Sequence, residues 1–277
     1  MKILITGSNG FLGKKIMDIL SKKFDVVGID RESDITKKEA INKIKEIKPD
    51  IIIHTAAYTN VDKCEIEQNL CYDINVNGTK NIVEAAKLIN AKLIHISTDF
   101  VFDGTKENYN EKDIPNPINY YSKTKYDAEE IIKKNPDHII LRSSVLYGYN
   151  DENDNPNFFK WVFENLKNNK KIRVVNDQIN NATLIDDICY AIIKLINQKG
   201  IFNAVGSEPI SRYDFALKIA ETFNFNKDLI EEITSEELNQ KAIRPKNTSL
   251  DISKITSLGI KMSSIEEGLL KIKRQIK

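Results

Sequence analysis

The chain has 277 residues, and its 41 lysines and arginines nearly balance its 40 aspartates and glutamates, for a formal net charge of +1. This balance argues against nucleic acid as a partner, because phosphate contacts call for a basic surplus. No apolar run is long enough to cross a bilayer and no signal peptide precedes the first strand-like segment, so we expect a cytoplasmic protein with no membrane partner.

Short β-branched runs alternate with segments of helical periodicity through the first half of the chain. Strands that alternate with helices form βαβ units, so this order predicts an α/β fold with a Rossmann-type, doubly wound parallel sheet. Each run is continuously apolar, as expected for strands covered by helices on both faces. The expected strands are Lys2–Thr6, Asp25–Ile29, Asp50–His54, Lys92–Ser97 and His138–Arg142, and Tyr121–Lys134 is an expected helix.

The second half is less regular, and a polar, turn-rich stretch over Tyr147–Asn157 marks the change. We therefore expect a dinucleotide-binding domain over residues 1–148 and a smaller α/β domain, mainly substrate-binding, over residues 149–277. Later segments can return to the first sheet, because no low-complexity linker separates the halves. The expected helices are Phe158–Asn168, Ile185–Asn197, Arg212–Phe223 and one that begins near Ser264, and the expected strands are Ile172–Val175 and Ile201–Asn203.

Three glycines follow the first expected strand with the spacing Gly7-x-x-Gly10-x-x-Gly13, and a helix follows them. Gly7 permits the tight turn out of the strand, Gly10 lets a pyrophosphate approach the backbone, and Gly13 lets the helix pack closely on the strand. The free N–H groups at the helix start would hold the phosphates. The pattern predicts a dinucleotide site formed by Gly7, Asn9, Gly10, Phe11, Leu12 and Gly13.

The end of the second expected strand carries Asp30 and Arg31, which point to different cofactors. A carboxylate here can bond the ribose 2′-hydroxyl of NAD(H), whereas an arginine can pair with the 2′-phosphate of NADP(H). The sequence has both, so the choice between NAD(H) and NADP(H) stays open. Asp34 and Ile35 are placed to meet the adenine edge, although a plain loop role fits them equally well.

A candidate catalytic set combines the strand end Ser97–Asp99 with Tyr121 and Lys125, which share one helix face four residues apart. The spacing alone is weak, because about one Tyr-x-x-x-Lys pair is expected by chance in so lysine-rich a chain. A second pair, Tyr190 and Lys194, lies in a merely amphipathic helix, and we interpret it as structural. Tyr121 stands out because it follows the glycine turn and the strand end in the order that builds one pocket.

The chemistry of this set is specific. A tyrosine pKa near 10 is too high for easy proton exchange at neutral pH, and a nearby ammonium lowers it. We therefore expect Lys125 to lower the pKa of Tyr121 and to bond the nicotinamide ribose. Tyr121 would protonate a carbonyl oxygen as hydride arrives from the cofactor, and the Thr98 hydroxyl would hold that oxygen in line.

The glycine pattern together with Tyr121 and Lys125 resembles the extended short-chain dehydrogenase/reductases. Within that group the chain resembles the dTDP-4-dehydrorhamnose reductase family over nearly its whole length. The segments that carry the resemblance are His54–Glu65, Ser97–Gly104, Tyr121–Lys125, Val175–Gln178 and Arg244–Asp251.

The resemblance implies reduction at C4 of a nucleotide-linked 4-keto-6-deoxyhexose, dTDP-4-dehydro-L-rhamnose to dTDP-L-rhamnose, with NADP(H) or NAD(H) as cofactor. A nucleotide sugar is then the partner, and a homodimer is the candidate assembly. The residues implied on the cofactor side are Ala56, Ala57, Tyr58, Ser97 and Thr98. The residues implied on the substrate side are Thr98, Asp99, Val101, Arg142, Val145, Asn157, Gln178 and Arg244.

Two departures from the family pattern lie on the substrate side. The family often has a tryptophan facing the sugar where this chain has Val145, and Asn180–Thr183 replaces a Gly-x-Pro-Thr segment. Two alternatives therefore stay open. One is a non-catalytic, NADP-binding subunit resembling the regulatory subunit of methionine adenosyltransferase. The other is a related epimerase or dehydratase, although Phe100 follows Asp99 where a dehydratase needs a second acid.

The cysteines and histidines do not match a metal-binding motif. The three cysteines, Cys64, Cys71 and Cys189, have spacings that fit no zinc site, so we expect reduced structural thiols and no metal. The three histidines, His54, His95 and His138, each lie in an apolar run, and we expect them in the core or at strand ends.

Overall fold

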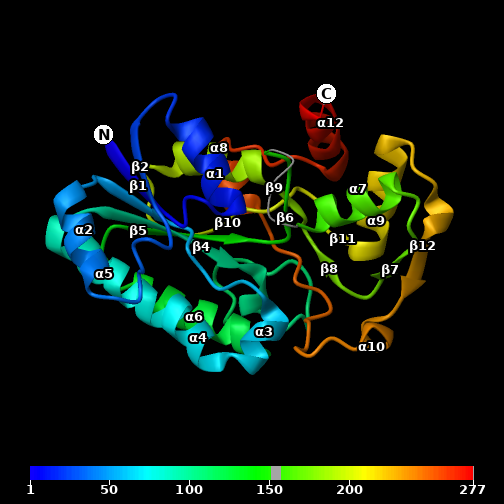
Figure 1. The fold of residues 1–277 in the computed structure, drawn as a ribbon, viewed down its shortest axis with the longest axis horizontal. Coiled ribbons are helices and arrows are strands. Elements are labelled where there is room, and N and C mark those ends of the chain that lie inside the picture. Colours follow the sequence, from blue (N-terminus) through cyan, green and yellow to red (C-terminus); the bar gives the residue numbers. More distant parts are fainter. Residues whose placement is uncertain (151–156, 277) are drawn as a thin grey trace.

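Six parallel strands form one central sheet in the order β10-β5-β4-β3-β1-β2 (Figure 1). This computed structural model describes residues 1–150 and 157–276 of the chain. The order confirms the Rossmann-type fold, because the strands wind outward in both directions from the centre of the sheet. The strands are β1 (Lys2–Thr6), β2 (Asp25–Ile29), β3 (Ile51–His54), β4 (Lys92–Thr98), β5 (His138–Ser143) and β10 (Gly200–Asn203).

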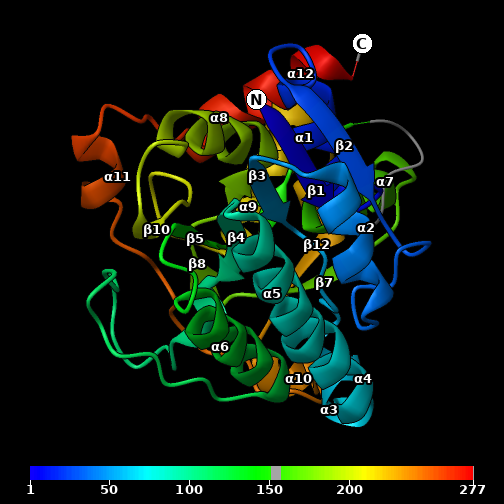
Figure 2. The same cartoon turned by 90° about the vertical axis from the view of Figure 1, so that its left-hand side faces the viewer.

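Helices cover both faces of the sheet, which explains why its strands are continuously apolar (Figures 1 and 2). In β1, Ile3 and Ile5 pack toward one helical layer, whereas Leu4 packs toward the other. The first layer holds α1 (Phe11–Leu20), α8 (Ile185–Leu195) and α11 (Ser253–Ser257), and the second holds α2 (Glu39–Ile47), α5 (Thr79–Ile89) and α6 (Tyr120–Ile132).

The chain between β3 and α5 is a run of short helical pieces that pack against α6. These pieces are α3 (Val61–Ile66), α4 (Gln68–Tyr72) and the π-helical turn η1 (Asp73–Gly78), and β4 later ends in the 3-10 turn η2 (Asp99–Val101). The sequence predicted none of them separately, because pieces of six residues or fewer are too short to show a helical period.

A second lobe packs beside the sheet around a cluster rich in phenylalanine. Its helices are α7 (Phe158–Lys167), α9 (Arg212–Phe223), α10 (Ser235–Leu238) and α12 (Ile265–Gln275), and η3 (Lys227–Leu229) is a short turn. Its short strands pair as β7 (Ile172–Val175) with β12 (Ile230–Ile233), β8 (Ile179–Asn180) with β11 (Ile210–Ser211), and β6 (Leu146–Tyr147) with β9 (Thr183–Leu184). Within residues 1–150 and 157–276, no helix is both long and apolar enough to span a bilayer.

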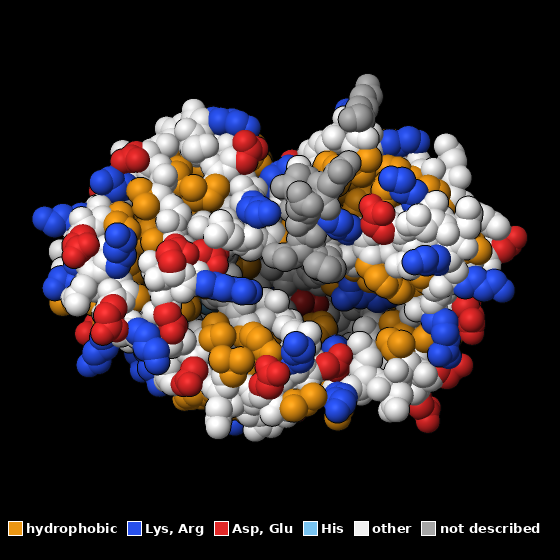
Figure 3. All heavy atoms as spheres, in the orientation of Figure 1, with side chains coloured by type: hydrophobic (Ala, Val, Ile, Leu, Met, Phe, Trp, Pro, Cys, Tyr) orange, Lys and Arg blue, Asp and Glu red, His pale blue; other side chains and the backbone are white. Residues whose placement is uncertain are grey.

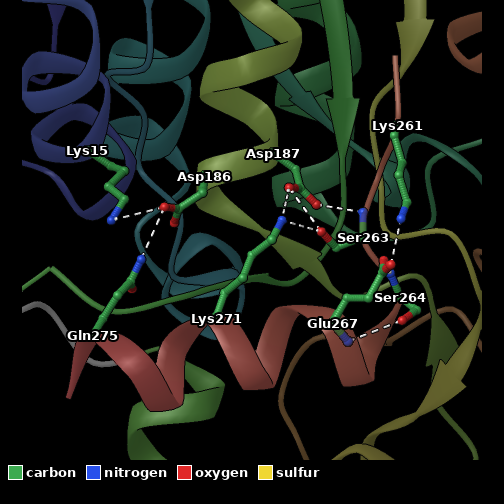
Figure 4. Close-up of polar contacts among 9 residues, drawn as sticks. All are labelled: Lys15, Asp186, Asp187, Lys261, Ser263, Ser264, Glu267, Lys271 and Gln275. Atoms are coloured by element: carbon green, nitrogen blue, oxygen red, sulfur yellow. Dashed lines mark hydrogen bonds and ion pairs between the residues drawn. The ribbon is translucent and has the colours of Figure 1, made fainter. Parts of the chain in front are cut away.

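Acidic residues at the start of α8 fasten the C-terminal helix α12 to the sheet side of the molecule (Figure 4). Asp186 forms an ion pair with Lys15 of α1 at 3.4 Å. Asp187 accepts hydrogen bonds from the Ser263 backbone N–H at 2.7 Å and from Lys271 of α12 at 3.3 Å. The two lobes are therefore joined by polar contacts as well as by the chain.

Candidate active site

The carboxyl ends of β1, β3, β4 and β5 meet at one edge of the sheet, where sheets of this topology bind their ligands. The predicted glycine turn follows β1, residues 55–58 follow β3, and Thr98 ends β4. On the face seen in Figure 1, the surface is hollowed between the sheet and the second lobe, and charged side chains lie in the hollow (Figure 3). Topology thus brings the predicted cofactor and catalytic segments to one place.

The glycine turn has the close approaches that its sequence pattern requires. Gly7 adopts a φ of +70°, and a Cβ there would lie 2.8 Å from Cα of Ala56. A Cβ on Gly13 would lie 2.1 Å from the Gly7 carbonyl oxygen, so a larger residue would push α1 away from β1. No side chain caps α1 at its N-cap residue Gly10, which leaves its first N–H groups for a ligand. These residues fit the pyrophosphate of a dinucleotide.

Asp30 organises the loop beside the glycine turn. Its carboxylate accepts the backbone N–H of Asn9 and that of Arg31, each at 2.8 Å. The Arg31 side chain is exposed, and within the described part of the chain it has no hydrogen bond or ion pair. Arg31 is therefore available for a 2′-phosphate, while Asp30 already has two donors.

Four other predicted cofactor residues use their side chains within the protein. Phe11 and Leu12 pack into the core on the α1 face of the sheet, so their backbone alone faces the glycine turn. Ile35 is buried between α2 and α5. Asp34 accepts hydrogen bonds from the backbone N–H and hydroxyl of Thr36, which lower the pKa of its carboxyl group. The plain loop role fits the Asp34 and Ile35 side chains better than an adenine contact.

The segment Ala56–Tyr58 is half-buried and is held from η1. The Asn75 side chain accepts the Tyr58 backbone N–H at 2.7 Å and donates to the Tyr58 carbonyl oxygen at 3.1 Å. The Tyr58 hydroxyl donates to the Glu67 carboxylate, and this bond raises the pKa of Tyr58 to about 12. The Tyr58 backbone and the Tyr58 hydroxyl are thus both held in place before any ligand binds.

The three predicted catalytic residues lie together. A capping box at Asn119 starts α6, which places Tyr121 and Lys125 on the side of the helix that faces the end of β4. The Tyr121 phenol lies close to the Thr98 hydroxyl, an interaction that opposes the rise in its pKa. The Lys125 ammonium donates to the Ile96 carbonyl oxygen at 2.7 Å. All three side chains are at least nine-tenths buried.

The expected effect of Lys125 on Tyr121 is contradicted by the structure. Burial raises the pKa of Tyr121 well above its usual value, and the nearby Asp99 carboxylate raises it further. Lys125 is turned toward Ile96 and lies 3.2 Å from Nε2 of His95. Burial lowers the pKa of Lys125 to about 8, although Glu129 partly offsets this effect. Tyr121 therefore holds its proton firmly at neutral pH.

Glu129, which the sequence reading missed, forms a buried ion pair beneath the catalytic set. Arg142 donates to it from Nε at 3.0 Å and from Nη2 at 2.8 Å, and the Ser97 hydroxyl donates to it at 2.6 Å. Arg142 and Ser97 therefore bond Glu129 within the protein, and the predicted contacts of Arg142 with substrate and of Ser97 with cofactor stay predictions. The sequence did hold a signal for Glu129: it lies four residues after Lys125, so both residues share one face of the expected helix.

Asp99 and Val101 also point into the protein rather than toward a ligand. The Asp99 carboxylate accepts hydrogen bonds from Ser144 at 2.8 Å, from Thr98 at 3.1 Å, and from Thr248. Burial raises its pKa, and these hydroxyl donors partly offset the rise. The Val101 side chain is fully buried in a small apolar cluster. Their side chains are therefore engaged within the protein, and their contacts with substrate stay predictions.

Gln178 and Arg244 connect segments of the protein to one another. The Gln178 amide donates to Ser235 and to Gln240, both at 2.9 Å. Arg244 forms a bidentate pair with Asp62 of α3, with both N···O distances 3.0 Å. Their donors are already used, so a direct contact with substrate would need these bonds to open.

Val145 and Asn157 belong to the second lobe. Val145 has a φ of +32°, which is strained for a β-branched residue, and its carbonyl oxygen accepts the Thr183 backbone N–H. The Asn157 side-chain oxygen caps α7 by accepting the Lys160 N–H at 3.1 Å. Its buried Nδ2 donates to no acceptor among the described residues.

Arg212, at the start of α9, is a second residue that the sequence reading missed. Its guanidinium lies 5.0 Å from the ring centroid of Phe158, and it interacts electrostatically with Asp99 and Arg244. Burial lowers the pKa of Arg212 to about 10. Within residues 1–150 and 157–276 its guanidinium forms no hydrogen bond or ion pair. A signal was present, because an arginine directly after the N-cap Ser211 opposes the helix dipole.

The histidines and cysteines are buried or take part in local bonds. His54 bonds Thr6 at 2.7 Å and Thr79 at 3.1 Å, and burial lowers its pKa to about 3. The thiols of all three cysteines are free and buried. Among the described residues, no group of histidine, cysteine, aspartate and glutamate side chains could hold a metal ion.

Comparison with protein families and curated proteins gives matches along the whole chain. A family model described as "RmlD substrate binding domain" matches residues 1–276. The dTDP-4-dehydrorhamnose reductase of Aggregatibacter actinomycetemcomitans is 36% identical over 292 residues, which cover 98% of each chain. Methionine adenosyltransferase 2 subunit beta of Rattus norvegicus is 32% identical over 278 residues, which cover 94% of this chain and 83% of the relative.

A solved structure agrees with these matches. The crystal structure of dTDP-4-dehydrorhamnose reductase from Bacillus anthracis in complex with NADP has a TM-score of 0.94 and 36% identity, and covers 99% of each chain.

Proposed function

The chain belongs to the RmlD substrate binding domain family, and from this premise we propose that it reduces the 4-keto group of a nucleotide-linked 6-deoxyhexose with NADPH or NADH. The proposed substrate is dTDP-4-dehydro-L-rhamnose, and the product is dTDP-L-rhamnose. The reductase relatives and the NADP complex of a similar structure support this reaction. The observation that carries it is the burial of Tyr121, Thr98 and Lys125 together at the strand end next to the glycine turn.

The nicotinamide cofactor, when bound, supplies a hydride to C4 of the sugar. Tyr121 keeps its proton at neutral pH because its phenol is buried, so it can donate that proton to the C4 oxygen as negative charge develops there. The Thr98 hydroxyl orients the same oxygen. Lys125 carries its charge below a pKa of about 8, and its ammonium would donate to the nicotinamide ribose.

On the substrate side we propose Arg212 as the residue that binds the diphosphate. Two observations support it: the guanidinium forms no hydrogen bond or ion pair among the described residues, and it lies over the ring of Phe158, the residue after Asn157 with its unused amide donor. An arginine in this setting suits a phosphate oxygen pair, because its planar fork donates two parallel bonds. Val145 is the proposed neighbour of the sugar ring.

A second candidate function follows from the relatives named methionine adenosyltransferase 2 subunit beta. A regulatory subunit of that kind would bind NADP without turning over a sugar. The buried Tyr121, Thr98 and Lys125 favour the reductase, because a purely binding role gives no reason to bury these polar groups together. Homodimer assembly and a cytoplasmic location stay predictions.

The test is steady-state oxidation of NADPH and of NADH with dTDP-4-dehydro-L-rhamnose. The reductase account predicts turnover with at least one cofactor and formation of dTDP-L-rhamnose. Tight NADPH binding without turnover would instead favour the regulatory subunit.

Replacement of the exposed Arg31 by alanine tests cofactor choice, since only the affinity for NADPH should fall if Arg31 holds the 2′-phosphate.

A further inference from the structure

Two buried thiols that the proposed reaction does not use lie next to each other beside the catalytic helix. Cys64 of α3 and Cys71 of α4 are fully buried, and their sulfur atoms are 2.7 Å apart, within hydrogen-bonding distance. A disulfide bond is about 2.05 Å long, so the sulfurs would need to approach by only about 0.7 Å. Cys189 lies apart from them, in the core cluster between α8 and the sheet.

The two thiols have different surroundings, and Cys71 is the one poised to react. The Asn75 amide donates to its sulfur at 3.5 Å, and the Thr124 hydroxyl lies at the same distance. Hydrogen bonding with Cys64, and then with these two groups, lowers the pKa of the Cys71 thiol. The same pairing raises the pKa of Cys64, which keeps its proton. Cys71 is therefore the readier of the two adjacent thiols to ionise, and a thiolate is the species that begins disulfide formation.

The thiol pair is in contact with both sides of the candidate active site. It shares an apolar cluster with Tyr121, and Thr124 donates to the Tyr121 carbonyl oxygen at 2.8 Å. On the other side, Asn75 holds the backbone of Tyr58. The thiol pair thus lies between the predicted nicotinamide segment and the catalytic tyrosine.

We propose that Cys64 and Cys71 are an oxidation site, and that a reversible disulfide between them switches the enzyme off. With hydrogen peroxide as oxidant, the Cys71 thiol loses its proton, the thiolate attacks one peroxide oxygen, and the O–O bond breaks. The departing hydroxide takes up the proton that Cys71 released and leaves as water. The Cys64 sulfur then attacks the resulting sulfenic acid, the S–S bond forms, and a second water leaves with the Cys64 proton. Two thiols are oxidised and one peroxide is reduced to two waters.

The loss of activity follows from the bonds that the disulfide removes. Asn75 loses the Cys71 sulfur that accepts from its amide, the Cys71 contact with the Thr124 hydroxyl shifts, and α3 and α4 are drawn toward each other. These groups hold Tyr58 and Tyr121 in place, so their displacement moves the proton donor relative to the cofactor. The disulfide itself does not depend on the proposed function, whereas the loss of activity does.

The test treats the full-length protein with hydrogen peroxide and counts thiols after denaturation, with peptide mass mapping of the 64–71 crosslink. Wild type should fall from three free thiols to one, and turnover should fall at least about tenfold and recover with dithiothreitol. The Cys189→Ser variant should respond like wild type, whereas Cys64→Ala and Cys71→Ser should keep their turnover after peroxide.

Three outcomes would overturn the proposal. A wild-type protein that keeps three thiols has no such site. A crosslinked protein with full turnover has the site without the switch. If peroxide inactivates Cys64→Ala as much as wild type, the loss of turnover does not come from the 64–71 disulfide. If no variant reduces the sugar even before oxidation, the proposed function fails, and the thiol count together with NADPH binding still decides whether the disulfide forms.

Discussion

The proton on Tyr121 is the residue-scale feature on which the proposed reaction depends. The spacing of Tyr121 and Lys125 predicted the pair, but it did not predict that burial and Asp99 would raise the pKa of the phenol. The tyrosine of a reductase must act as an acid when hydride is delivered. The raised pKa makes the Tyr121 phenol a weaker acid, which the strongly basic oxygen that forms at C4 can still deprotonate. Thr98 supplies the second contact to the same substrate oxygen.

Replacement of Tyr121 by phenylalanine should lower kcat by about 100- to 10,000-fold, because it removes the general acid. NADPH binding should change little, since the ring and its packing remain. Stopped-flow reduction and fluorescence titration with NADPH would separate the two effects. Tyr126→Phe on the same helix is the matched control and should retain wild-type kcat; unchanged turnover in Tyr121→Phe would exclude the assigned role.

Replacement of Arg212 by glutamine should raise KM for the nucleotide sugar by about 10- to 100-fold, the effect of losing a charge-assisted hydrogen bond in a buried site. KM for NADPH should stay near that of wild type. Arg173→Gln is the control, because Arg173 is half-exposed on β7 and pairs with Glu231 at 3.6 Å. Equal KM values for the sugar in both variants would remove Arg212 from the substrate site.

The rate should also respond to pH through Lys125. Its pKa of about 8 means that the ammonium is present below that pH and is lost above it. We therefore expect kcat/KM to decline above about pH 8 with the loss of one proton. The decline of kcat/KM above about pH 8 should persist in Lys123→Gln, which removes an exposed lysine from the same helix. A flat profile from pH 7 to 9 would show that the charge on Lys125 is not required.

At the scale of elements, α6 carries most of the candidate site, and its buried face is specified by more than the catalytic pair. Glu129 and Arg142 form an ion pair in which both side chains are almost completely buried. Removing one partner of such a pair leaves the other charge buried without compensation. This pair therefore ties α6 to β5, one helical turn after Lys125.

Replacement of Glu129 by glutamine should lower the free energy of unfolding by about 3–5 kcal/mol. Urea denaturation of the purified protein would measure this loss. The neighbouring residue provides the control, because Glu130 pairs with Lys133 on the surface and Glu130→Gln should cost less than about 1 kcal/mol. Similar losses in the two variants would contradict the structural role of Glu129.

The elements that the sequence predicted well are those with a strong local signal. The bounds of β1, β2, β7 and α9 agree with the prediction, because apolar runs and an N-cap mark their ends. The pieces α3, α4 and η1 were not predicted. The sequence therefore could not show that Cys64 of α3 and Cys71 of α4 lie next to each other. The π-helical turn at η1, which aims Asn75 at Tyr58, depends on packing against α6 rather than on a local pattern.

At the scale of the whole molecule, the predicted return of a later segment to the sheet is confirmed by β10. Contacts between distant segments explain what could not be predicted. Arg244 reaches Asp62, and Thr248 reaches Asp99, across most of the chain length. Arg244 and Asp99, which were expected on the substrate side, therefore also connect distant segments of the protein to each other. No local pattern distinguishes an arginine that binds a ligand from one that binds an aspartate 182 positions away.

The central claim is that this molecule transfers hydride to C4 of a nucleotide-linked sugar while Tyr121 protonates the oxygen. The most direct measurement uses NADPH that carries deuterium in place of its transferable hydrogen, with dTDP-4-dehydro-L-rhamnose as substrate and analysis of the product by mass spectrometry and NMR. The account predicts one deuterium, located at C4 of dTDP-L-rhamnose, and none with Tyr121→Phe on the same timescale. A product without deuterium at C4, or no product at any protein concentration, would contradict it.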